Sequence, residues 1–270
     1  MCSLEPRGTF MKMDTVGRVT RAKYECLLFD LDDTLYPLSI GFNLACRKNI
    51  EEFMLKYLDI EESQVPRMCL ELYREYGTTM AGLKALGYEF DNDEFHAYAH
   101  GRLPYETLRP DPVLRNLLLS MPQRKIIFTN GDKAHAQQVL KRLALEDCFE
   151  GIICFETLNP PLQPSDFMDA DKSPILCKPS PEAFDAAIRL ANVDPKKTIF
   201  FDDSARNIAS GKAAGLHTVI VGSSTPMSDA DHALRSIHNI KEAIPEIWDG
   251  EEEQMNQVIQ QAAVGTEVLA

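Results

Sequence analysis

The sequence contains no apolar run of the roughly 18 to 20 residues that a helix needs to cross a bilayer, which argues against a membrane protein. Its seven cysteines include no C-x-x-C pair, so we expect neither a disulfide framework nor a zinc site. Free thiols favour a reducing compartment, and we expect the cytoplasm, with the nucleus and organelles left open. There is no basic tract, and the net charge of −13 disfavours binding to nucleic-acid polymers.

The two ends of the chain differ from its middle. Residues 1–21 contain Glu5 and Asp14 and no continuous apolar core, so we expect a flexible N-terminal extension and no signal peptide, with a targeting role left open. We expect residues 249–270 to form a C-terminal tail, and residues 157–174, rich in proline and acidic side chains, to form a surface loop. The length of 270 residues suits one large globular domain or a domain that carries a smaller insertion.

Short apolar runs alternate with helical patterns along most of the chain. The runs are nearly continuous, as is typical of strands buried on both faces of a parallel sheet, and they cover residues 26–29, 126–128, 152–155, 199–201 and 218–221. Helical periodicity follows most of them, over residues 133–145, 181–191 and 205–214, and we expect Gly215 to end the last helix. The alternation predicts an α/β fold with a doubly wound parallel sheet.

The interval between the first two predicted strands breaks this alternation. Apolar residues recur in it every three or four positions, and glycines divide it into short helices. We therefore predict an all-helical domain over residues 40–106, inserted into a core that is formed by residues 22–39 and 107–248. A proline-rich segment, residues 103–112, is expected to return the chain to the core.

Polar side chains follow several of the predicted strands. They are Asp30 after the first strand, Thr129 and Asn130 after the second, and Asp202 and Asp203 after the fourth. In open α/β sheets ligands bind outside the carboxyl ends of the strands, so we expect these residues to share one crevice. Lys178, in the loop before the helix that starts near Pro181, can join them.

Several carboxylates in one crevice repel one another unless a cation lies between them. The oxygen ligands that Mg²⁺ prefers are offered by Asp30, Asp32, Asp202 and Asp203, and this ion often shares a substrate phosphate. Mg²⁺ and Lys178 would supply the local positive charge that a chain of net charge −13 needs to hold an anion. The Thr129 hydroxyl and the amides that open the next helix add donors, so the set predicts a phosphate site.

The segment DLDDT (30–34) suggests a division of roles. In an extended segment residues two apart point the same way, so one carboxylate can attack phosphorus while the other protonates the leaving oxygen. Asp33 is expected to point away from Asp30 and Asp32 and to cap or accept a backbone hydrogen bond. Thr34 is expected to orient Asp32 through its hydroxyl.

Four segments resemble, in this order, the motifs of the haloacid dehalogenase superfamily: DLDDT (30–34), FTNG (128–131), Lys178 and FFDDSARN (200–207). The insertion at residues 40–106 lies where that superfamily carries a helical cap of the C1 type. Within the superfamily, FDLDDTLYP, FTNGDKAHA and FFDDSARNI are similar to pyrimidine 5′-nucleotidase-like proteins of plants and fungi. The resemblance covers residues 22–225 and implies a Rossmann-like core and a Mg²⁺-dependent phosphatase that hydrolyses a nucleoside 5′-monophosphate such as UMP or CMP.

The resemblance also implies a role for each matching residue. Asp30 would be the nucleophile that forms an aspartyl-phosphate, and Asp32 the general acid and base. Thr129 and Asn130 would bind the phosphate, and Lys178 would anchor it and stabilise ionised Asp30. The metal would be held directly by Asp30, the Asp32 backbone carbonyl and Asp203, and Asp202 would bind the metal or a water coordinated to it. Asn207 stands where the superfamily often has Asp, and its amide would hold a metal-bound water with one charge fewer.

The residues that contact the rest of the substrate carry no motif. Position and residue type favour a set of candidates within the insertion: Tyr76, Thr78, Thr79, His100 and Arg102. His96 and His100 are four residues apart on a predicted helix, and we expect two histidines on the surface of the insertion rather than a metal pair.

Several other functions stay open. A sugar phosphate or pyridoxal phosphate fits the same chemistry as a nucleotide, and a phosphomutase would pass the phosphate to a sugar hydroxyl. A dehalogenase shares the nucleophilic aspartate but needs neither the magnesium cluster nor a general acid. A regulatory binder without turnover is the non-enzymatic alternative, against which the intact motif residues argue. The only partner indicated is a small phosphomonoester, and no signal for an oligomeric state is present.

Overall fold

The computed structural model describes residues 23–161 and 174–248. The predicted N-terminal extension, residues 1–21, and the predicted tail, residues 249–270, lie outside the described residues, as does most of the predicted surface loop at 157–174. Among the described helices, none combines the length and the hydrophobicity needed to traverse a bilayer.

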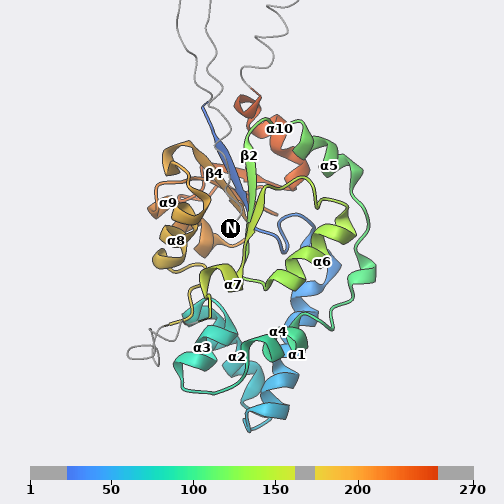
Figure 1. Ribbon diagram of the computed structural model, residues 1–270, viewed down its shortest axis with the longest axis vertical. Helices are drawn as coiled ribbons and strands as arrows, with labels where there is room; N and C mark the ends of the chain where they lie inside the picture. The colour runs from blue at the N-terminus through green and yellow to red at the C-terminus, as the bar shows by residue number, and fades with distance from the viewer. Residues whose placement is uncertain (1–22, 162–173, 249–270) are drawn as a thin grey trace, which may run out of the picture.

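A six-stranded parallel sheet forms the centre of the molecule (Figure 1). Its strands are β1 (Cys26–Phe29), β2 (Arg124–Phe128), β3 (Gly151–Ile153), β4 (Thr198–Asp202), β5 (His217–Val221) and β6 (His232–Leu234), and their order is β3-β2-β1-β4-β5-β6. The predicted parallel α/β sheet is confirmed, and five of the strands lie close to the predicted runs. β6 was not predicted because its three residues, HAL, form no apolar run.

Side chains alternate between the two faces of the sheet, and each face packs against its own helices. Leu27 and Phe29 join one core cluster with residues of α5 (Pro112–Leu119) and α6 (Lys133–Leu143), whereas Leu28 joins a second cluster with residues of α8 (Pro181–Ala191) and α9 (Ala205–Ala213). In Figure 1 these two helix layers lie on opposite sides of β2 and β4. The apolar runs of the sequence are thus strands that are covered on both faces.

Four helices lie between β1 and β2, and we call residues 42–99, which contain them, the helical insertion. They are α1 (Phe42–Tyr57), α2 (Val65–Tyr76), α3 (Thr79–Ala85) and α4 (Asn92–Ala99). Their apolar faces meet in a cluster around Phe53, Met54 and Leu83, which is separate from the two clusters of the sheet. Figure 1 shows the four helices together below the carboxyl ends of the strands. The exact limits of the predicted helical domain, 40 and 106, stay a prediction.

Several local signals explain where the helices begin and end. The Asp132 carboxylate caps α6 by accepting a hydrogen bond from the His135 backbone N–H, and Asp91 caps α4 in the same way. Gly215 has φ +88 and follows Ala214, the C-cap of α9, as expected of a glycine that ends a helix. The remaining short elements are α7 (Phe155–Leu158), α10 (Ile240–Ala243) and the 3₁₀ turns at Leu38–Ile40, Tyr105–Thr107, Pro195–Lys197, Ile237–Asn239 and Pro245–Ile247.

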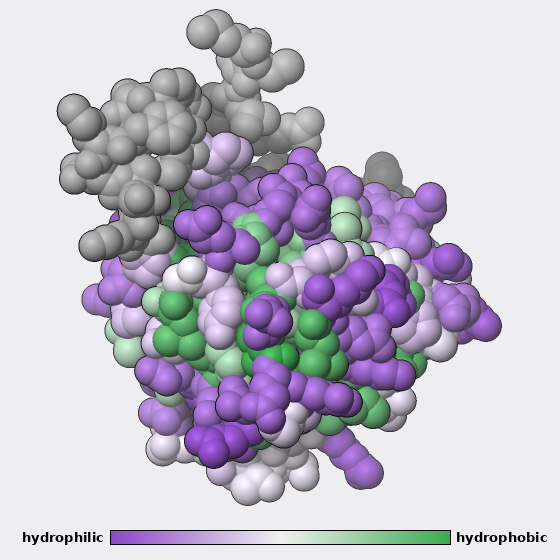
Figure 2. Space-filling model, turned by 90° about the horizontal axis from the view of Figure 1, so that it is seen from below, coloured by the Kyte–Doolittle hydropathy of each residue, from purple (hydrophilic) through white to green (hydrophobic). Residues whose placement is uncertain are grey.

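The surface of the insertion is mostly polar. Seen from the end of the molecule that carries the insertion, hydrophilic residues surround a smaller group of hydrophobic ones (Figure 2). Exposed large apolar side chains of the insertion include Leu44 and Leu55 of α1 and Leu86, which directly follows α3.

Candidate active site

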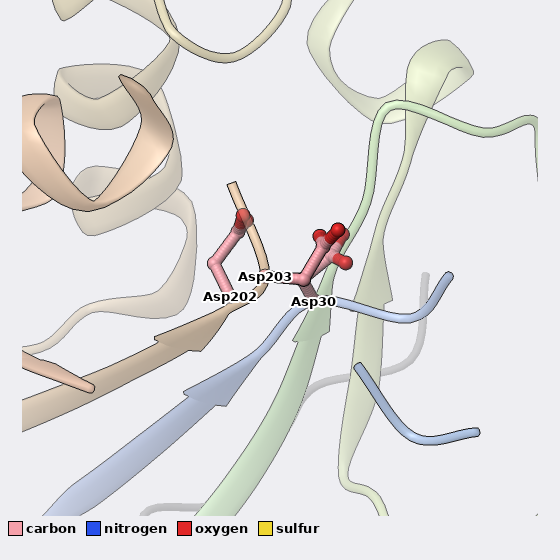
Figure 3. Close-up of side chains that lie close together, drawn as sticks. All are labelled: Asp30, Asp202 and Asp203. Carbon is pink, nitrogen blue, oxygen red and sulfur yellow. The ribbon is translucent and has the colours of Figure 1, made fainter. Parts of the chain in front are cut away.

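Acidic side chains gather where the order of the strands reverses. β1 and β4 are neighbours, with Phe29 paired to Phe201, and the chain proceeds from this pair in opposite directions across the sheet. Asp30 follows β1 and Asp202 ends β4, so both leave the sheet at the place where open α/β folds bind ligands. Oxygen atoms of Asp30, Asp202 and Asp203 lie within 4.8 Å of one another (Figure 3).

Lys178 lies buried between two of these carboxylates. Its Nζ is 2.7 Å from Asp30 Oδ1 and 2.7 Å from Asp202 Oδ2, and only 1% of its side chain is exposed. The backbone of Lys178 is held by the Asn130 side chain, which donates to the Lys178 carbonyl at 2.9 Å and accepts from its N–H at 2.8 Å. Three segments far apart in sequence are therefore joined around a single ammonium group, as the strand-end argument predicts.

Burial and the charges of neighbouring residues shift the pKa values of Asp30, Asp203 and Lys178. Burial raises the pKa of Asp30 well above its usual range, and Asp202 and Asp203 add to the rise while the Lys178 ammonium opposes it. Loss of hydration and repulsion by Asp202 raise the pKa of Asp203 to about 7. Burial alone would lower the pKa of Lys178, but Asp202 and Asp30 outweigh it and raise that pKa. When ionised, the three carboxylates thus carry more negative charge than the single Lys178 ammonium can neutralise.

The donor set fits Mg²⁺. Asp30, Asp202 and Asp203 offer only carboxylate oxygens, the ligand type that this hard cation prefers. The crowding that raises the pKa values of Asp30 and Asp203 is what a divalent ion would relieve. The Asp32 carboxylate does not belong to this group, and metal binding through the Asp32 backbone carbonyl stays a prediction.

Asp32 has its own hydrogen-bond partners. Its Oδ1 accepts from the Tyr36 hydroxyl and lies 2.8 Å from His135 Nε2. Burial would raise the pKa of Asp32, but the His135 ring together with the hydrogen bonds from His135 and Tyr36 lowers it to about 2. Asp32 is therefore ionised in the substrate-free protein, and 38% of its side chain is exposed.

Two supporting residues differ from their expected contacts. The Thr34 hydroxyl donates to Asp30 Oδ2 at 2.9 Å, so it orients Asp30 and not Asp32. Asp33 has φ +59 and interacts with the Asn43 side-chain amide at 3.4 Å instead of accepting a backbone hydrogen bond. The positive φ turns the chain directly after Asp32, which the extended-segment argument for DLDDT did not include.

Asn207 also has a direct protein partner. Its amide donates to both oxygens of Asp202, at 3.0 and 3.1 Å, and Asp202 Oδ1 accepts from the Ser204 backbone N–H as well. These donors hold the Asp202 carboxylate in place. The predicted contact of Asn207 with a metal-bound water stays a prediction.

The predicted phosphate donors after β2 are partly engaged within the protein. Thr129 is buried, and its Oγ1 accepts from the Gly131 N–H at 3.0 Å. At the start of α6, the Lys133 N–H donates to Glu156, and Asp132 accepts from the His135 N–H at 3.1 Å. The amides that were predicted to bind an anion thus already donate to two side chains, Asp132 and Glu156.

A cavity of about 330 Å³ lies between the insertion and the loops after β1 and β2. Asp32, Asn130 and His135 line it from the core, the predicted contact residues Thr78 and Thr79 line it from the insertion, and His100 lines it from the position directly after α4. The other two predicted contact residues, Tyr76 and Arg102, are not among its lining residues. Arg102 instead pairs with Glu52 at 2.8 Å and stacks on Tyr98, so substrate contact by Tyr76 and Arg102 finds no support in the geometry and stays a prediction.

The prediction that His96 and His100 lie on the surface of the insertion is wrong. His96 is only 7% exposed and packs edge-on against Phe155 of the core, with ring centroids 4.4 Å apart. His100 Nδ1 lies 2.5 Å from Asp132 Oδ1, and its ring stacks on that of His135. The periodicity placed both histidines on one helix face, but it could not show that this face is covered by the core.

His135 and Tyr36 are two site residues that were not predicted from the sequence. One signal was available for His135, because it lies in the first turn of the helix after Asn130, and helical side chains point back toward the N-terminus. For Tyr36, four residues after Asp32, the printed sequence gives no comparable signal, since its contact depends on the turn at Asp33.

The comparisons with known proteins agree with this geometry. The haloacid dehalogenase-like hydrolase family matches residues 24–215. The chain belongs to that family. The family match confirms the superfamily expected from the four motifs and includes the whole helical insertion.

The individual proteins to which this chain is similar share less than 30% sequence identity with it. The chain is 27% identical over 201 residues to Phosphate metabolism protein 8 of Saccharomyces cerevisiae, covering 71% of this chain and 60% of that protein, so it spans less than two thirds of that relative. It is 28% identical over 209 residues to a glyceraldehyde 3-phosphate phosphatase of Pyrococcus furiosus, covering 73% of this chain and 80% of that protein. Among solved structures, the HAD-hydrolase YfnB from Bacillus subtilis bound to magnesium has a TM-score of 0.52 at 21% identity, covering 82% of this chain and 98% of that one.

Proposed function

We propose that the protein is a Mg²⁺-dependent phosphomonoester hydrolase that works through an aspartyl-phosphate on Asp30. The observation that carries the proposal is the convergence of the Asp30, Asp202 and Asp203 carboxylates, with the Lys178 ammonium buried between Asp30 and Asp202. The family match to hydrolases and the magnesium-bound structural neighbour support it. A dehalogenase would use Asp30 but would have no use for the acidic cluster or for Asp32.

In the first half-reaction an oxygen of Asp30 attacks phosphorus, and the bond between phosphorus and the leaving oxygen breaks. The Lys178 ammonium, already 2.7 Å from Asp30 Oδ1, favours the ionised form of Asp30 against the effect of burial and can also bind a phosphate oxygen. Thr34 holds the second oxygen of Asp30 at 2.9 Å, which limits its rotation. Bound Mg²⁺, held by Asp30, Asp202, Asp203 and the Asp32 backbone carbonyl, would neutralise the negative charge of the carboxylates and of the phosphate.

Asp32 moves the protons in both half-reactions. Its carboxylate has a pKa of about 2 in the substrate-free protein, and a bound phosphate dianion raises this pKa because like charges disfavour ionisation. Protonated Asp32 gives its proton to the leaving oxygen. Ionised Asp32 then takes a proton from the water that attacks phosphorus and releases phosphate from Asp30.

The helical insertion serves as a cap in this proposal. The cavity that would hold the leaving group is lined both by the core and by the insertion, and we propose that the insertion moves away from the core to admit substrate. At the contact, Gly77 of the insertion lies against the Lys178 loop, where an added Cβ would be 2.4 Å from the Lys178 carbonyl oxygen. The cap thus closes directly over the catalytic lysine.

For the substrate we propose a nucleoside 5′-monophosphate, with the pyrimidine nucleotides UMP and CMP favoured. The similarity of the three motif segments to pyrimidine 5′-nucleotidase-like proteins supports this choice. A cavity of about 330 Å³ is at the small end of the range of roughly 300 to 1,000 Å³ for ligand sites and favours a small leaving group. The relative that is named as a glyceraldehyde 3-phosphate phosphatase favours a sugar phosphate as the second candidate.

A substrate screen tests the proposal. Phosphate release is measured from UMP, CMP, AMP, glucose 6-phosphate, glyceraldehyde 3-phosphate and pyridoxal phosphate, each with Mg²⁺ and with a chelator. We expect Mg²⁺-dependent release with the highest kcat/KM for UMP or CMP. A preference for the sugar phosphates would refute the nucleotide assignment, and isomer formation without phosphate release would indicate a phosphomutase. Absence of release from every ester would refute the phosphatase itself.

A further inference from the structure

The two oxygens of the Asp32 carboxylate lie in different surroundings. Oδ1 receives the Tyr36 hydroxyl and faces His135 Nε2 at 2.8 Å. For Oδ2, the part of the chain that the structure describes offers no hydrogen-bond partner. Oδ2 lies toward Gly131, where an added Cβ would be 3.8 Å away, and both Asp32 and Gly131 line the cavity between the insertion and the core. One oxygen is therefore anchored and the other is free.

The anchor His135 is itself fixed from several sides. Only 1% of its side chain is exposed, and its Nδ1 lies 2.7 Å from the Tyr105 hydroxyl. Its ring stacks on that of His100, with centroids 4.5 Å apart and an angle of 25° between the planes. A ring held in this way presents Nε2 to Asp32 in one direction only.

The direction of the hydrogen bond follows from the acceptor. Oδ1 accepts from the Tyr36 hydroxyl, and a carboxyl oxygen that carries no proton can only accept, so His135 Nε2 carries the hydrogen and donates it to Asp32 Oδ1. The Tyr105 hydroxyl can donate to Nδ1 of a neutral ring or accept from Nδ1 of a charged one. In both cases the bond from Nε2 to Oδ1 is the same, so the orientation of Asp32 does not depend on the charge of His135.

We propose that His135 and Tyr36 are positioning residues for the general acid and base. They fix Asp32 Oδ1, and they leave Oδ2 as the atom that exchanges protons. In the first half-reaction the proton on Oδ2 passes to the leaving oxygen as its bond to phosphorus breaks. In the second, Oδ2 accepts a proton from the attacking water. This inference rests on the proposed phosphatase function and adds to it the atom of Asp32 that reacts and the residues that aim it.

A series of esters with different leaving groups tests the inference. The oxygen of an acidic phenol can leave as the anion without receiving a proton. The oxygen of a weakly acidic alcohol needs a proton in order to leave. The probes are p-nitrophenyl, phenyl and benzyl phosphate, which are similar in size and differ strongly in the acidity of the released alcohol. Alcohol release is measured in a single turnover with saturating enzyme and Mg²⁺, because all three esters give the same aspartyl-phosphate afterwards.

The variants separate positioning from folding. Tyr36→Phe deletes one hydroxyl that donates to Oδ1, and His135→Leu deletes the other donor, while His135→Gln places an amide N–H near the former Nε2. His238→Gln is the matched control, because His238 also pairs with a carboxylate through Nε2, Asp111 at 2.9 Å, and does not line the cavity between the insertion and the core. Thermal unfolding of each variant shows whether it is folded.

We expect His135→Leu to slow benzyl phosphate cleavage about 10- to 100-fold, which is less than the full general-acid contribution of about 10²- to 10⁴-fold because Asp32 itself is still present, and to change p-nitrophenyl phosphate cleavage less than about threefold. Tyr36→Phe should show the same trend, His135→Gln should recover part of the loss, and His238→Gln should match the wild type. An equal loss for all three esters in a folded variant would overturn the inference and leave the proposed function intact. A wild-type protein that cleaves none of the esters would overturn the proposed function itself.

Discussion

The buried position of Lys178 makes a strong prediction about stability. Lys178→Met keeps the length of the side chain but removes the ammonium that lies 2.7 Å from both Asp30 and Asp202. Asp202 is fully buried and Asp30 is 7% exposed, so neither carboxylate can be solvated in place of the lost partner. Removal of one member of a buried ion pair typically destabilises a protein by about 3 to 5 kcal/mol. We expect Lys178→Met to lower the free energy of unfolding by about this amount when a chelator removes divalent ions.

The assay is urea unfolding of the wild type and of Lys178→Met without divalent ions. The control is Lys212→Met, because Lys212 pairs with Asp231 at 2.5 Å with 42% and 31% of the two side chains exposed, and such a pair contributes less than about 1 kcal/mol. The deficit of Lys178→Met should shrink as the pH falls, because protonation removes the unbalanced carboxylate charge and the folded state then binds more protons than the unfolded one. If Lys178→Met loses no more stability than Lys212→Met, the conclusion that Lys178 neutralises buried carboxylates is refuted.

Three further perturbations test separate parts of the structure. Gly87→Ala should lose about 1 to 2 kcal/mol of stability because of its φ of +86, and Gly77→Ala, with φ +88 and the contact to the Lys178 carbonyl, should lose more, so equal losses in urea unfolding would contradict the contact. Asn130→Ala removes both hydrogen bonds to the Lys178 backbone and should lower kcat/KM about tenfold, and an unchanged kcat/KM would count against this role. Burial lowers the pKa of His96 to about 4, so the unfolded chain binds the proton more tightly and stability should fall by roughly 3 kcal/mol as the pH drops from 6.5 to 4. His96→Gln should flatten that part of the curve, and parallel curves for variant and wild type would refute it.

The sequence predicts the fold and the acidic cluster for one physical reason. A parallel sheet brings the carboxyl ends of its strands to one edge, so polar residues directly after apolar runs must meet there. Asp30 and Asp202 obey this rule, and Lys178, which comes from a loop, lies within hydrogen-bond distance of both. Strand β6 was not predicted, because its three residues are too few to give a recognisable hydrophobic pattern.

Contacts that depend on the exact turn or on docking between segments could not be predicted. Thr34 reaches Asp30 instead of Asp32 because the positive φ of Asp33 rotates the chain between them. His96 is buried because the core covers the face of α4 that carries it, which helical periodicity within α4 does not report. The same is true of His135, whose contact with Asp32 spans 103 residues of sequence.

Mass spectrometry of the protein during turnover tests the central claim most directly. The protein is mixed with p-nitrophenyl phosphate and Mg²⁺, quenched in acid and digested, and the peptide that contains Asp30 is examined for a phosphoryl group. We expect this group on Asp30 in the wild type, and neither the modification nor turnover in Asp30→Asn, which should still unfold cooperatively. Turnover by Asp30→Asn at the wild-type rate, or a phosphoryl group on another residue, would contradict the account.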